Sequence, residues 1–564
     1  MSRVRVQTHR EAPPLPTVAE TVGAVLASLG VRDVFGLVGS GNFVVTNSLV
    51  AAGAAFIASR HEGGAVAMAD AYARVSGRLG VCSVHQGPGL TNTLTGLTEA
   101  AKSRTPLLVL AGDTAAAAIN SNFRLDQDSV VASVGAIPER IYGPATAVAD
   151  VVRAAHRAQT ERCPVVLMMP LDVQAVEQPD SAPSPRSAAP LPLPRPAASA
   201  VAEVADRLAG AERPLILAGR GAVLAGAGEA LERVGDAVGA LLATSAVANG
   251  LFSRSPWNLG ISGGFASPLA SELIAQADLV LAVGASLNAW TTAHGKLIGP
   301  QAVVIQVDLE PRAIGVHRHV DLGVLGDASE TASALVSELA ARSLARKGWR
   351  STELAERIRT HRWRDETYAD RGDDEHIDPR TLSIALDTIL PEQRTLAVDS
   401  GHFMGYPAMY LRVPGPDAFV FAQAFMSVGL GLAGAIGAAV ARPDRLTVAA
   451  LGDGGALMAL PELETAARLG LDMLVLIYND AAYGAEVHHF APARHPLDIV
   501  RFPDTDFAAI GRALGLEGIT VRRLADLAGV RKWAERKQRP GLVLDAKVAP
   551  GVFAEWLEEA FRGH

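Results

Sequence analysis

Short apolar runs rich in Leu, Val and Ile alternate along the whole chain with longer alanine-rich stretches of helical pattern. This alternation is typical of parallel sheets covered by helices, because two parallel strands need a crossover between them, usually a helix. Most runs end in or beside Gly, Asp, Asn or His, and α/β sheets bind ligands at the carboxyl ends of their strands. The sequence therefore predicts an α/β fold of doubly wound parallel sheets. Expected strands include residues 33–39, 79–85, 106–113, 164–170, 214–220, 278–286 and 473–480.

Two changes in composition divide the chain of 564 residues. Residues 178–199 are dense in Pro, Ala and Ser and predict an extended linker. Residues 342–376 are highly charged and partly helical in pattern, and they predict a solvated connector. We therefore expect three domains, each near the usual size of about 100–200 residues. The predicted segments outside these two are a tail at 1–16, a first domain at 17–177, a middle domain at 200–341 and a last domain at 377–564.

The first and last domains share a repeated sequence pattern. In each, a glycine loop is followed by a helix with a glutamate twelve residues after the first glycine, and then by a buried strand. Either two generic α/β units agree by coincidence, or two like-folded domains flank a different middle domain. The matching residues are Gly87, Gly89 and Glu99 in the first domain and Gly452, Gly454 and Glu464 in the last.

Composition excludes several classes of protein. The net charge is −8, whereas a nucleic-acid-binding protein needs a basic surface for the phosphates. Two cysteines, Cys82 and Cys163, are too few for a disulfide framework or a zinc cluster, so we expect a reducing compartment, the cytoplasm. The start of the chain lacks the apolar segment of a secretory signal. The most apolar stretch, 426–441, is too short for a membrane span and predicts a buried helix, so we expect no membrane partner.

The sharpest chemical signal lies in the last domain. Asp453 follows a strand pattern within Gly-Asp-Gly-Gly and precedes a helix, so free backbone N–H groups could face a phosphate there. Asn479 ends the neighbouring strand 26 residues later, which places its amide oxygen beside the Asp453 carboxylate. Two hard oxygen ligands next to a diphosphate suit Mg²⁺, because phosphate oxygens can complete its octahedral coordination shell. The alternative is a pair of turn residues, because many Asp-Gly turns only need tolerance of positive φ.

These residues resemble the diphosphate motif of thiamine diphosphate enzymes of the 2-oxo acid decarboxylase and acetohydroxyacid synthase group. The resemblance covers nearly the whole chain and implies pyrimidine-binding, middle and diphosphate-binding domains in that order. It implies bound thiamine diphosphate and Mg²⁺, with Asp453, Asn479 and the backbone carbonyl of Ala481 as the protein ligands of the metal. Asp480 stands where the family has a second Asn, which puts that side chain's contact in doubt but not the metal.

Glu62 supplies the second half of the resemblance. The alternative is that this glutamate only stabilises its helix, because a negative charge at a helix start interacts favourably with the helix dipole by about 0.3–1 kcal/mol. Within Arg-His-Glu followed by Gly-Gly and an alanine-rich helix, it resembles the family's cofactor-activating glutamate, which shares a proton with the aminopyrimidine ring in a poorly solvated slot. Because this residue and the metal site lie on different domains, the resemblance implies active sites between the subunits of a homodimer or homotetramer.

The resemblance also places residues around the cofactor. The family bends the cofactor over an apolar side chain, and the alignment places Val428 there, with Met426 as the other candidate if the register slips. Ordinary helix packing is the alternative for both. The other implied contacts are Gly401, His402, Phe403, Gly429, Gly452, Gly454, Gly455, Tyr483 and Gly484.

Three residues favour a decarboxylase or carboligase. Ser40 and His85 stand where benzoylformate decarboxylase has its active-site serine and a catalytic histidine, and Glu486 stands where pyruvate decarboxylase has a proton-relay glutamate. The implied roles are orientation of substrate by Ser40 and proton transfer by His85 and Glu486. The alternatives are a polar residue at a sheet edge for His85 and a polar lid around Glu486, where His488 and His489 follow on the same predicted helix.

Other positions depart from the family. Thr291 replaces the second histidine of benzoylformate decarboxylase, with His294 only nearby, and Arg124 replaces a glutamine of the synthases. A cation at position 124 could bind a substrate carboxylate or be a surface charge. In the middle domain, residues 262–264 and Ser286 replace the Met-His-Gly and Arg that contact flavin in the synthases. FAD is therefore an alternative that the sequence does not favour.

The sequence thus predicts a thiamine diphosphate- and Mg²⁺-dependent carbon–carbon lyase or carboligase that acts on a small 2-oxo acid or related carbonyl compound. The first alternative is an acetolactate synthase-type transferase with FAD on the middle domain. The second is a non-catalytic regulatory relative, against which the presence of Glu62, Asp453 and Asn479 argues.

Overall fold

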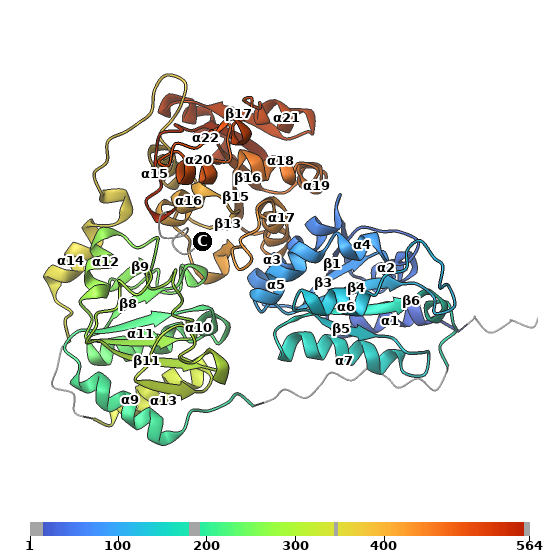
Figure 1. The fold of residues 1–564 in the computed structure, drawn as a ribbon, viewed down its shortest axis with the longest axis horizontal. Helices are drawn as coiled ribbons and strands as arrows, with labels where there is room; N and C mark the ends of the chain where they lie inside the picture. The colour runs from blue at the N-terminus through green and yellow to red at the C-terminus, as the bar shows by residue number, and fades with distance from the viewer. Residues whose placement is uncertain (1–14, 180–191, 343–347, 558–564) are drawn as a thin grey trace, which may run out of the picture. The chain divides into compact units, whose positions relative to one another are not determined.

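Three parallel sheets organise the chain. The computed structural model describes residues 15–179, 192–342 and 348–557, so most of the expected tail and of the expected linker lies outside the described residues. Each sheet has six strands, with helices packed on it (Figure 1). One compact unit contains the first sheet, and another contains the second and third. The predicted α/β fold with three doubly wound domains is confirmed.

The first sheet has the strand order β2-β1-β3-β4-β6-β5. On one face, helix α1 packs against α2 and α7 over a core of valine, leucine and alanine side chains. The strands are β1 Asp33–Gly36, β2 Ala55–Ala58, β3 Gly80–Val84, β4 Leu107–Asp113, β5 Ile137–Arg140 and β6 Pro164–Pro170. The helices are α1 Val18–Ser28, α2 Phe43–Ala51, α3 Glu62–Ser76, α4 Pro88–Thr91, α5 Leu94–Lys102, α6 Gln127–Ser133, α7 Ala147–Thr160 and α8 Leu171–Gln174.

The second sheet has the order β12-β11-β10-β7-β8-β9, in which all strands are parallel and the strand order reverses between β7 and β10. This is the doubly wound order of dinucleotide-binding folds. The strands are β7 Pro214–Ala218, β8 Leu241–Thr244, β9 Asn258–Ile261, β10 Leu279–Val283, β11 Val303–Asp308 and β12 Leu322–Leu325. The helices are α9 Ala198–Gly210, α10 Arg220–Leu224, α11 Gly228–Val238, α12 Pro268–Ala275 and α13 Ala328–Ala340, and α14 Thr352–Thr360 follows in the charged connector.

The third sheet repeats the order of the first, β14-β13-β15-β16-β18-β17. The repeated sequence pattern of the two outer domains therefore reflects like folds, and the middle domain differs from them in its strand order. The strands are β13 Arg394–Val398, β14 Phe419–Phe421, β15 Leu446–Gly452, β16 Met473–Asn479, β17 Glu517–Val521 and β18 Leu542–Lys547. The helices are α15 Pro379–Ile389, α16 Gly405–Tyr410, α17 Gly431–Ala441, α18 Asp453–Met458, α19 Glu462–Leu469, α20 Gly484–Phe490, α21 Phe507–Ala513 and α22 Leu527–Ala534.

One expected element is shorter than the sequence suggested. The helix predicted over 426–441 begins only at Gly431. Met426 has φ 57° and Gly429 has φ 92°, both in the left-handed region, which a right-handed helix cannot include. Residues 426–430 therefore form a turn at the carboxyl edge of the third sheet, and only the remainder of the apolar stretch is the buried helix α17.

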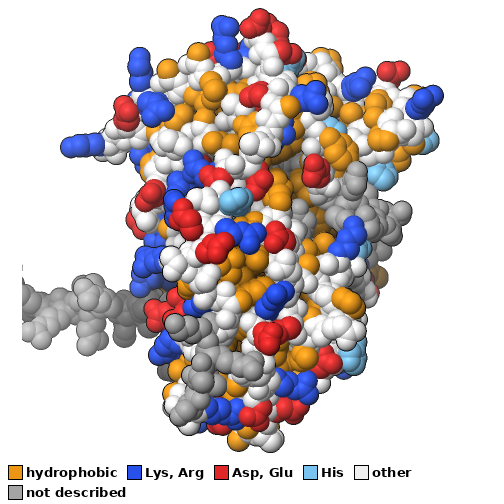
Figure 2. Space-filling model, turned by 90° about the vertical axis from the view of Figure 1, so that its left-hand side faces the viewer, with side chains coloured by type: hydrophobic (Ala, Val, Ile, Leu, Met, Phe, Trp, Pro, Cys, Tyr) orange, Lys and Arg blue, Asp and Glu red, His pale blue; other side chains and the backbone are white. Residues whose placement is uncertain are grey.

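The surface carries charges of both signs. On the face shown in Figure 2, Lys and Arg side chains are interspersed with Asp and Glu and do not gather into one basic field. Among the described residues, no helix is both long enough and apolar enough to cross a membrane.

A buried ion-pair cluster links helix α15 to strand β13 of the third sheet. Asp387 on α15 pairs with Arg394 on β13, and it accepts hydrogen bonds from Arg364 Nη1 and Arg412 Nε, each at 2.8 Å. Asp387 and Arg394 are both almost completely buried. Burial of these two charges is tolerable only while each satisfies the other, because an unpaired charge in the interior is costly.

Replacement of Asp387 by Ala should therefore destabilise the protein by about 3–5 kcal/mol, because Arg394 would be left buried without its carboxylate. The measurement is the midpoint of urea or thermal unfolding. Asp444→Ala is the matched control: Asp444 pairs with Arg442 on the surface, and its loss should change stability by about 1 kcal/mol or less. Equal midpoints for the two variants would contradict this account.

Candidate functional site

Asp453 and Asn479 lie side by side at the carboxyl edge of the third sheet. β15 and β16 are parallel neighbours in which Gly452 is registered with Tyr478. Asp453, the first residue of α18, follows Gly452, and Asn479, the last residue of β16, follows Tyr478. Neighbouring strands are about 4.8 Å apart. Both side chains are buried. The structure thus brings together the two residues that the sequence predicted as metal ligands.

A second carboxylate, Asp480, adjoins Asp453. Burial raises the pKa of Asp453, and the negative charge of Asp480 raises it further. Burial likewise raises the pKa of Asp480, whose Oδ2 lies 3.5 Å from His402 Nε2. Within the described residues, no Lys or Arg pairs with either carboxylate in the contacts that define this edge. A divalent cation would favour the ionised forms of both groups, so the chemistry of these donors fits a bound metal.

The amide of Asn479 is held from behind. Its Nδ2 donates to Asp545 Oδ1 at 2.9 Å and to the carbonyl oxygen of Thr505 at 3.2 Å, and its Oδ1 accepts from Ala481 N at 3.1 Å. The Ala481 carbonyl oxygen accepts from Phe502 N at 2.8 Å. A carbonyl oxygen has two lone pairs, so this bond leaves one for a further partner.

Glycines around Asp453 allow neighbouring groups to approach closely. A Cβ on Gly454 would lie 2.9 Å from Tyr483 Cε1, and a Cβ on Gly455 would lie 2.3 Å from Asp399 Oδ2. A Cβ on Gly484 would lie 2.3 Å from the His402 ring. These positions therefore exclude larger residues. We call the backbone around Gly454, Gly455 and Gly484 the glycine cradle.

Asp399, which the sequence did not single out, shapes the turn before α17. Its buried carboxylate accepts hydrogen bonds from Gly429 N at 2.9 Å and Gly431 N at 3.1 Å. Burial raises its pKa to about 6, and the backbone donors act in the opposite direction. This turn presents Met426 and Val428, both exposed, and Val428 Cγ1 lies 3.2 Å from the Cβ position of Gly455. Of these two residues, Val428 is the one that lies beside Gly455.

Two buried histidines pack behind the cradle. The rings of His402 and His488 are 4.9 Å apart, and burial lowers the pKa of each to about 4. His488 lies on α20, where it also contacts Phe553 edge to face. Glu486 lies in the first turn of the same helix and is partly exposed. His488 therefore serves packing, and Glu486 is more accessible than His488.

Glu62 begins α3 in the first unit and is buried. Its Oε2 accepts a hydrogen bond from Asn92 Nδ2 at 2.9 Å. A Cβ on Gly89 would lie 3.6 Å from Glu62 Oε1 and 3.1 Å from the Cβ of His85, so the glutamate and the histidine face the same small residue. The sequence did not single out Asn92, and its position in Gly-Pro-Gly-Leu-Thr-Asn, directly after the glycine loop, was the only available signal.

Ser40 and His85 form a hydrogen-bonded pair. His85 Nδ1 lies 2.9 Å from the carbonyl oxygen of Gln86, which only accepts, so Nδ1 carries a proton. In the neutral ring, Nε2 is then the acceptor, and the Ser40 hydroxyl, 3.3 Å away, donates to it. The edge of the ring meets Phe123 at 5.0 Å between centroids. The structure thus joins two predicted residues and orients Nε2 as a proton acceptor.

In the middle domain, the segment at residues 262–264 packs closely against Trp290 and Thr291. A Cβ on Gly264 would lie 2.6 Å from Trp290 Cη2, and a Cβ on Gly263 would lie 2.1 Å from the Trp290 carbonyl oxygen. Ser262 Oγ donates to the carbonyl oxygen of Thr291, which is buried. Thr291 is therefore part of the packed interior of the middle domain. Arg124 lies exposed in the first unit, and no contact of its side chain connects it to the candidate site.

No group of three or more His, Cys, Asp or Glu side chains in the described part of the chain is arranged to hold a metal. The candidate centre at Asp453 differs from such a cluster because its other donors are an amide and a carbonyl oxygen. Magnesium accepts this set, since it takes few protein ligands and retains water or phosphate oxygens.

Lowering the pH should destabilise the third domain through His402 and His488. Their pKa of about 4 in the folded protein is below the ordinary 6.5, so their stabilising contribution is complete above pH 6.5 and is lost as the pH falls towards 4. His488→Gln should therefore show a smaller fall in unfolding midpoint between pH 7.5 and 4.5 than the wild type. His319→Gln, at an exposed histidine, is the control and should retain the wild-type fall. An unchanged pH dependence in His488→Gln would refute the assignment.

Comparison with known proteins agrees with this geometry. Three family profiles match the chain in order: the thiamine pyrophosphate enzyme N-terminal TPP binding domain at residues 16–132, the central domain at 201–335 and the C-terminal TPP binding domain at 399–544. Thiamine pyrophosphate is another name for thiamine diphosphate. The two outer profiles cover Glu62 and Asp453, respectively.

Full-length relatives also match. Sulfoacetaldehyde acetyltransferase from Castellaniella defragrans is 28% identical over 94% of this chain and 92% of the relative. The acetolactate synthase large subunit from Parasynechococcus marenigrum is 29% identical over 90% of this chain and 84% of the relative. A probable 2-ketoarginine decarboxylase from Pseudomonas aeruginosa is 32% identical over 91% of this chain and 90% of the relative. The chain therefore belongs to the thiamine pyrophosphate enzyme family and is a thiamine diphosphate-dependent enzyme.

Proposed function

We propose that this protein is a thiamine diphosphate- and Mg²⁺-dependent carbon–carbon lyase or carboligase that acts on a 2-oxo acid or related carbonyl compound. The observation that supports the proposal most strongly is the glycine cradle with Asp453 and Asn479 at adjacent strand ends. The relatives have names of the same reaction class, including an acetolactate synthase and a probable decarboxylase.

Asp453, Asn479 and the Ala481 carbonyl oxygen would hold Mg²⁺, with Gly452, Gly454 and Gly455 beside the diphosphate. Gly401, His402, Tyr483 and Gly484 would line the same cradle. When bound, the cofactor would supply a nucleophilic carbon for the substrate carbonyl and, in its cationic ring, a sink for the electron pair left when carbon dioxide departs. The protein's contribution is then position and proton transfer.

Glu62 would hold a proton at the aminopyrimidine ring. Its burial keeps water away, and Asn92 holds one carboxylate oxygen, so the other is directed at a partner. Ser40 would orient the substrate, and His85 Nε2 would take up or return a proton through the contact with the Ser40 hydroxyl. Glu486, on the first turn of α20, would serve a second proton transfer.

We propose a cytoplasmic homodimer or homotetramer with active sites between subunits. Large apolar side chains are exposed near both groups of site residues, and a second copy of the chain would cover them. In the first unit they include Phe43, Val44, Ile119 and Phe123, and in the second unit Phe425, Met426, Val428, Leu457 and Met458. The two free cysteines are compatible with a reducing compartment.

An acetolactate synthase-type enzyme with FAD is the second candidate, supported by the relative of that name. The packing of Trp290 against Gly263 and Gly264 argues against flavin on the middle domain. A purified protein without a flavin absorption band would agree with the first proposal, whereas a yellow protein would favour the second. A non-catalytic regulatory role would require failure to bind thiamine diphosphate in calorimetry.

Glu62→Gln should lower kcat by about 10²-fold or more on the best substrate, because the amide cannot exchange a proton with the cofactor. The best substrate is first found by screening 2-oxo acids and aldehydes with thiamine diphosphate and Mg²⁺. Glu161→Gln makes the same chemical change at an exposed surface position and should retain wild-type activity. If Glu62→Gln equals the wild type, the proposed activation is wrong.

Removal of the metal by a chelator should abolish tight binding of thiamine diphosphate, because the diphosphate would then face Asp453 without a neutralising cation. Calorimetric titration of the chelated protein with thiamine diphosphate measures this loss, and excess Mg²⁺ should restore binding. Equal affinity with and without metal would show that Asp453 and Asn479 do not act through Mg²⁺.

A further inference from the structure

A buried charged network behind Asn479 has no part in the roles described so far. It lies on β18, the parallel neighbour of β16, where Asn479 is registered with Lys547 and Ile477 with Asp545. Asp545 is fully buried and Lys547 is nearly so. Charges are rare at such depth and persist where their contacts are complete, so this pair requires a physical explanation.

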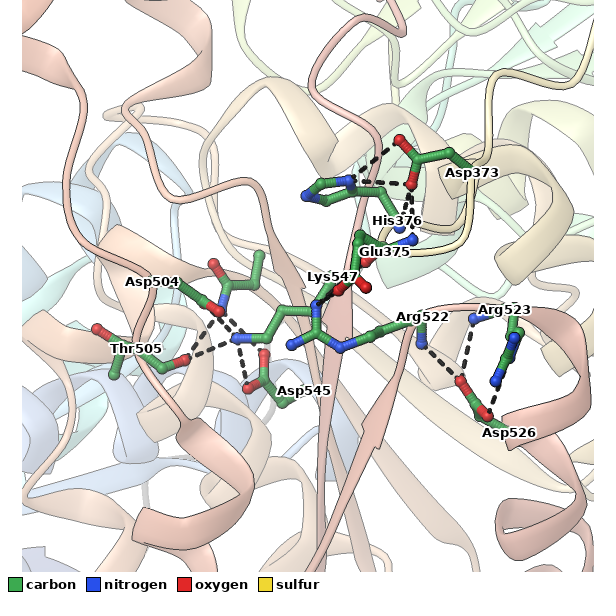
Figure 3. A network of polar contacts seen from close by, with 11 residues as sticks. Asp373, Glu375, His376, Asp504, Thr505, Arg522, Arg523, Asp526, Asp545 and Lys547 are labelled. Carbon is green, nitrogen blue, oxygen red and sulfur yellow. Dashed lines mark hydrogen bonds and ion pairs between the residues drawn. The ribbon is translucent and has the colours of Figure 1, made fainter.

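Lys547 has three oxygen partners within this network, two by hydrogen bonds and one by an ion pair (Figure 3). Nζ lies 2.9 Å from Asp545 Oδ2 and 2.8 Å from the carbonyl oxygen of Thr505, and it also pairs with Asp504. Asp545 Oδ2 accepts a further hydrogen bond from Phe507 N at 3.1 Å. The remaining oxygen, Oδ1, accepts from Asn479 Nδ2 at 2.9 Å. Asn479 is therefore the residue through which this network adjoins the candidate metal site.

These partners allow only one orientation of the Asn479 amide. The Asp545 carboxylate and the Thr505 carbonyl can only accept, so both require the NH₂ end of the amide. A rotation of the amide by half a turn would set its oxygen against two acceptors and lose both bonds. Oδ1 must therefore point away from β18, where it accepts from Ala481 N.

The ammonium of Lys547 makes this arrangement stable. A carboxylate in the interior carries a high desolvation cost, which a directly paired cation offsets. Lys547 provides that cation from the same strand, two residues beyond Asp545, and Asp504 and Thr505 hold it from the loop before α21. The amide-orienting carboxylate is thus tied to β18 and to this loop at once.

We infer that Asp545 and Lys547 are positioning residues for the metal: they fix the Asn479 amide so that its oxygen, and not its nitrogen, faces the metal beside Asp453. The inference rests on the proposed function, because it requires Asn479 to be a ligand. Metal ligands in proteins are commonly oriented by such outer partners, whose loss weakens metal affinity by about 10–100-fold.

The test measures Mn²⁺ affinity by electron paramagnetic resonance of the full-length protein with thiamine diphosphate, with thermal unfolding of the metal-free protein in parallel. Asp545→Asn should weaken Mn²⁺ binding by about 10–100-fold, since an amide can donate or accept and no longer selects one orientation of Asn479. Lys547→Arg retains the charge and should bind Mn²⁺ within a few-fold of the wild type. Asp444→Asn, on a surface ion pair, is the control for the substitution itself.

The double variant Asp545→Asn/Lys547→Met separates orientation from folding. It removes both charges, so its metal-free unfolding midpoint should exceed that of Asp545→Asn, while its Mn²⁺ affinity stays low. Wild-type affinity in the double variant would overturn the inference.

Asn479→Ala distinguishes failure of the inference from failure of the proposed function. If Asn479→Ala weakens Mn²⁺ binding and the Asp545 variants do not, Asn479 is a ligand but needs no positioning. If Asn479→Ala also binds Mn²⁺ like the wild type, the proposed metal site itself is wrong, and the inference is wrong with it.

Discussion

The parallel register of β15, β16 and β18 is the constraint on which the candidate site depends. Because all strands of the sheet point the same way, their carboxyl ends meet at one edge, and each strand delivers its last side chains there. Asp453 directly follows β15, Asn479 is the last residue of β16, and Lys547 is the last residue of β18. A shift of one strand by one residue would turn these side chains to the other face of the sheet. The register of the buried hydrophobic strands therefore determines which side chains meet at the site.

Charges in this domain divide into two kinds by their partners. Asp387 and Asp545 are buried against Arg394 and Lys547, respectively, and each pair neutralises itself. Asp399 and Asp453 are also buried, yet their contacts are backbone N–H groups and another carboxylate, and burial raises the pKa of both. The first kind secures the fold. The second kind places carboxyl groups at the edge where a cation would be bound, and their ionised forms cost stability without a ligand.

Much of this architecture was readable from the sequence, for physical reasons. Strands such as β4 and β16 are buried on both faces, so they appear as uninterrupted apolar runs, and the glycine loops mark the ends of the preceding strands, β3 and β15. The start of α17 was not readable, because a stretch of Gly and Ala does not reveal that Met426 and Gly429 adopt positive φ.

The supporting residues were also beyond sequence reasoning. Asn92 contacts Glu62 across 30 residues, and Asp545 contacts Asn479 across 66. A lone Asn or Asp in a strand or loop has no local pattern that indicates such a partner, because only the folded sheet brings the two together. Motifs identify the residues that touch a ligand more readily than those that hold them in place.

The two like-folded outer domains show how one sheet order can serve two chemistries. By position in the sheet, β4 of the first domain corresponds to β16 of the last, and β4 ends in Asp113 where β16 ends in Asn479. Asp113 is neutralised by Arg140, whereas no cationic side chain pairs with Asp453 beside Asn479 in the contacts of the described edge. A carboxylate already paired with Arg has little affinity left for a metal. Under the proposed function, the first domain would therefore present Glu62 and His85 for proton transfer, and the last domain would present the uncompensated oxygens that a divalent cation and a diphosphate require.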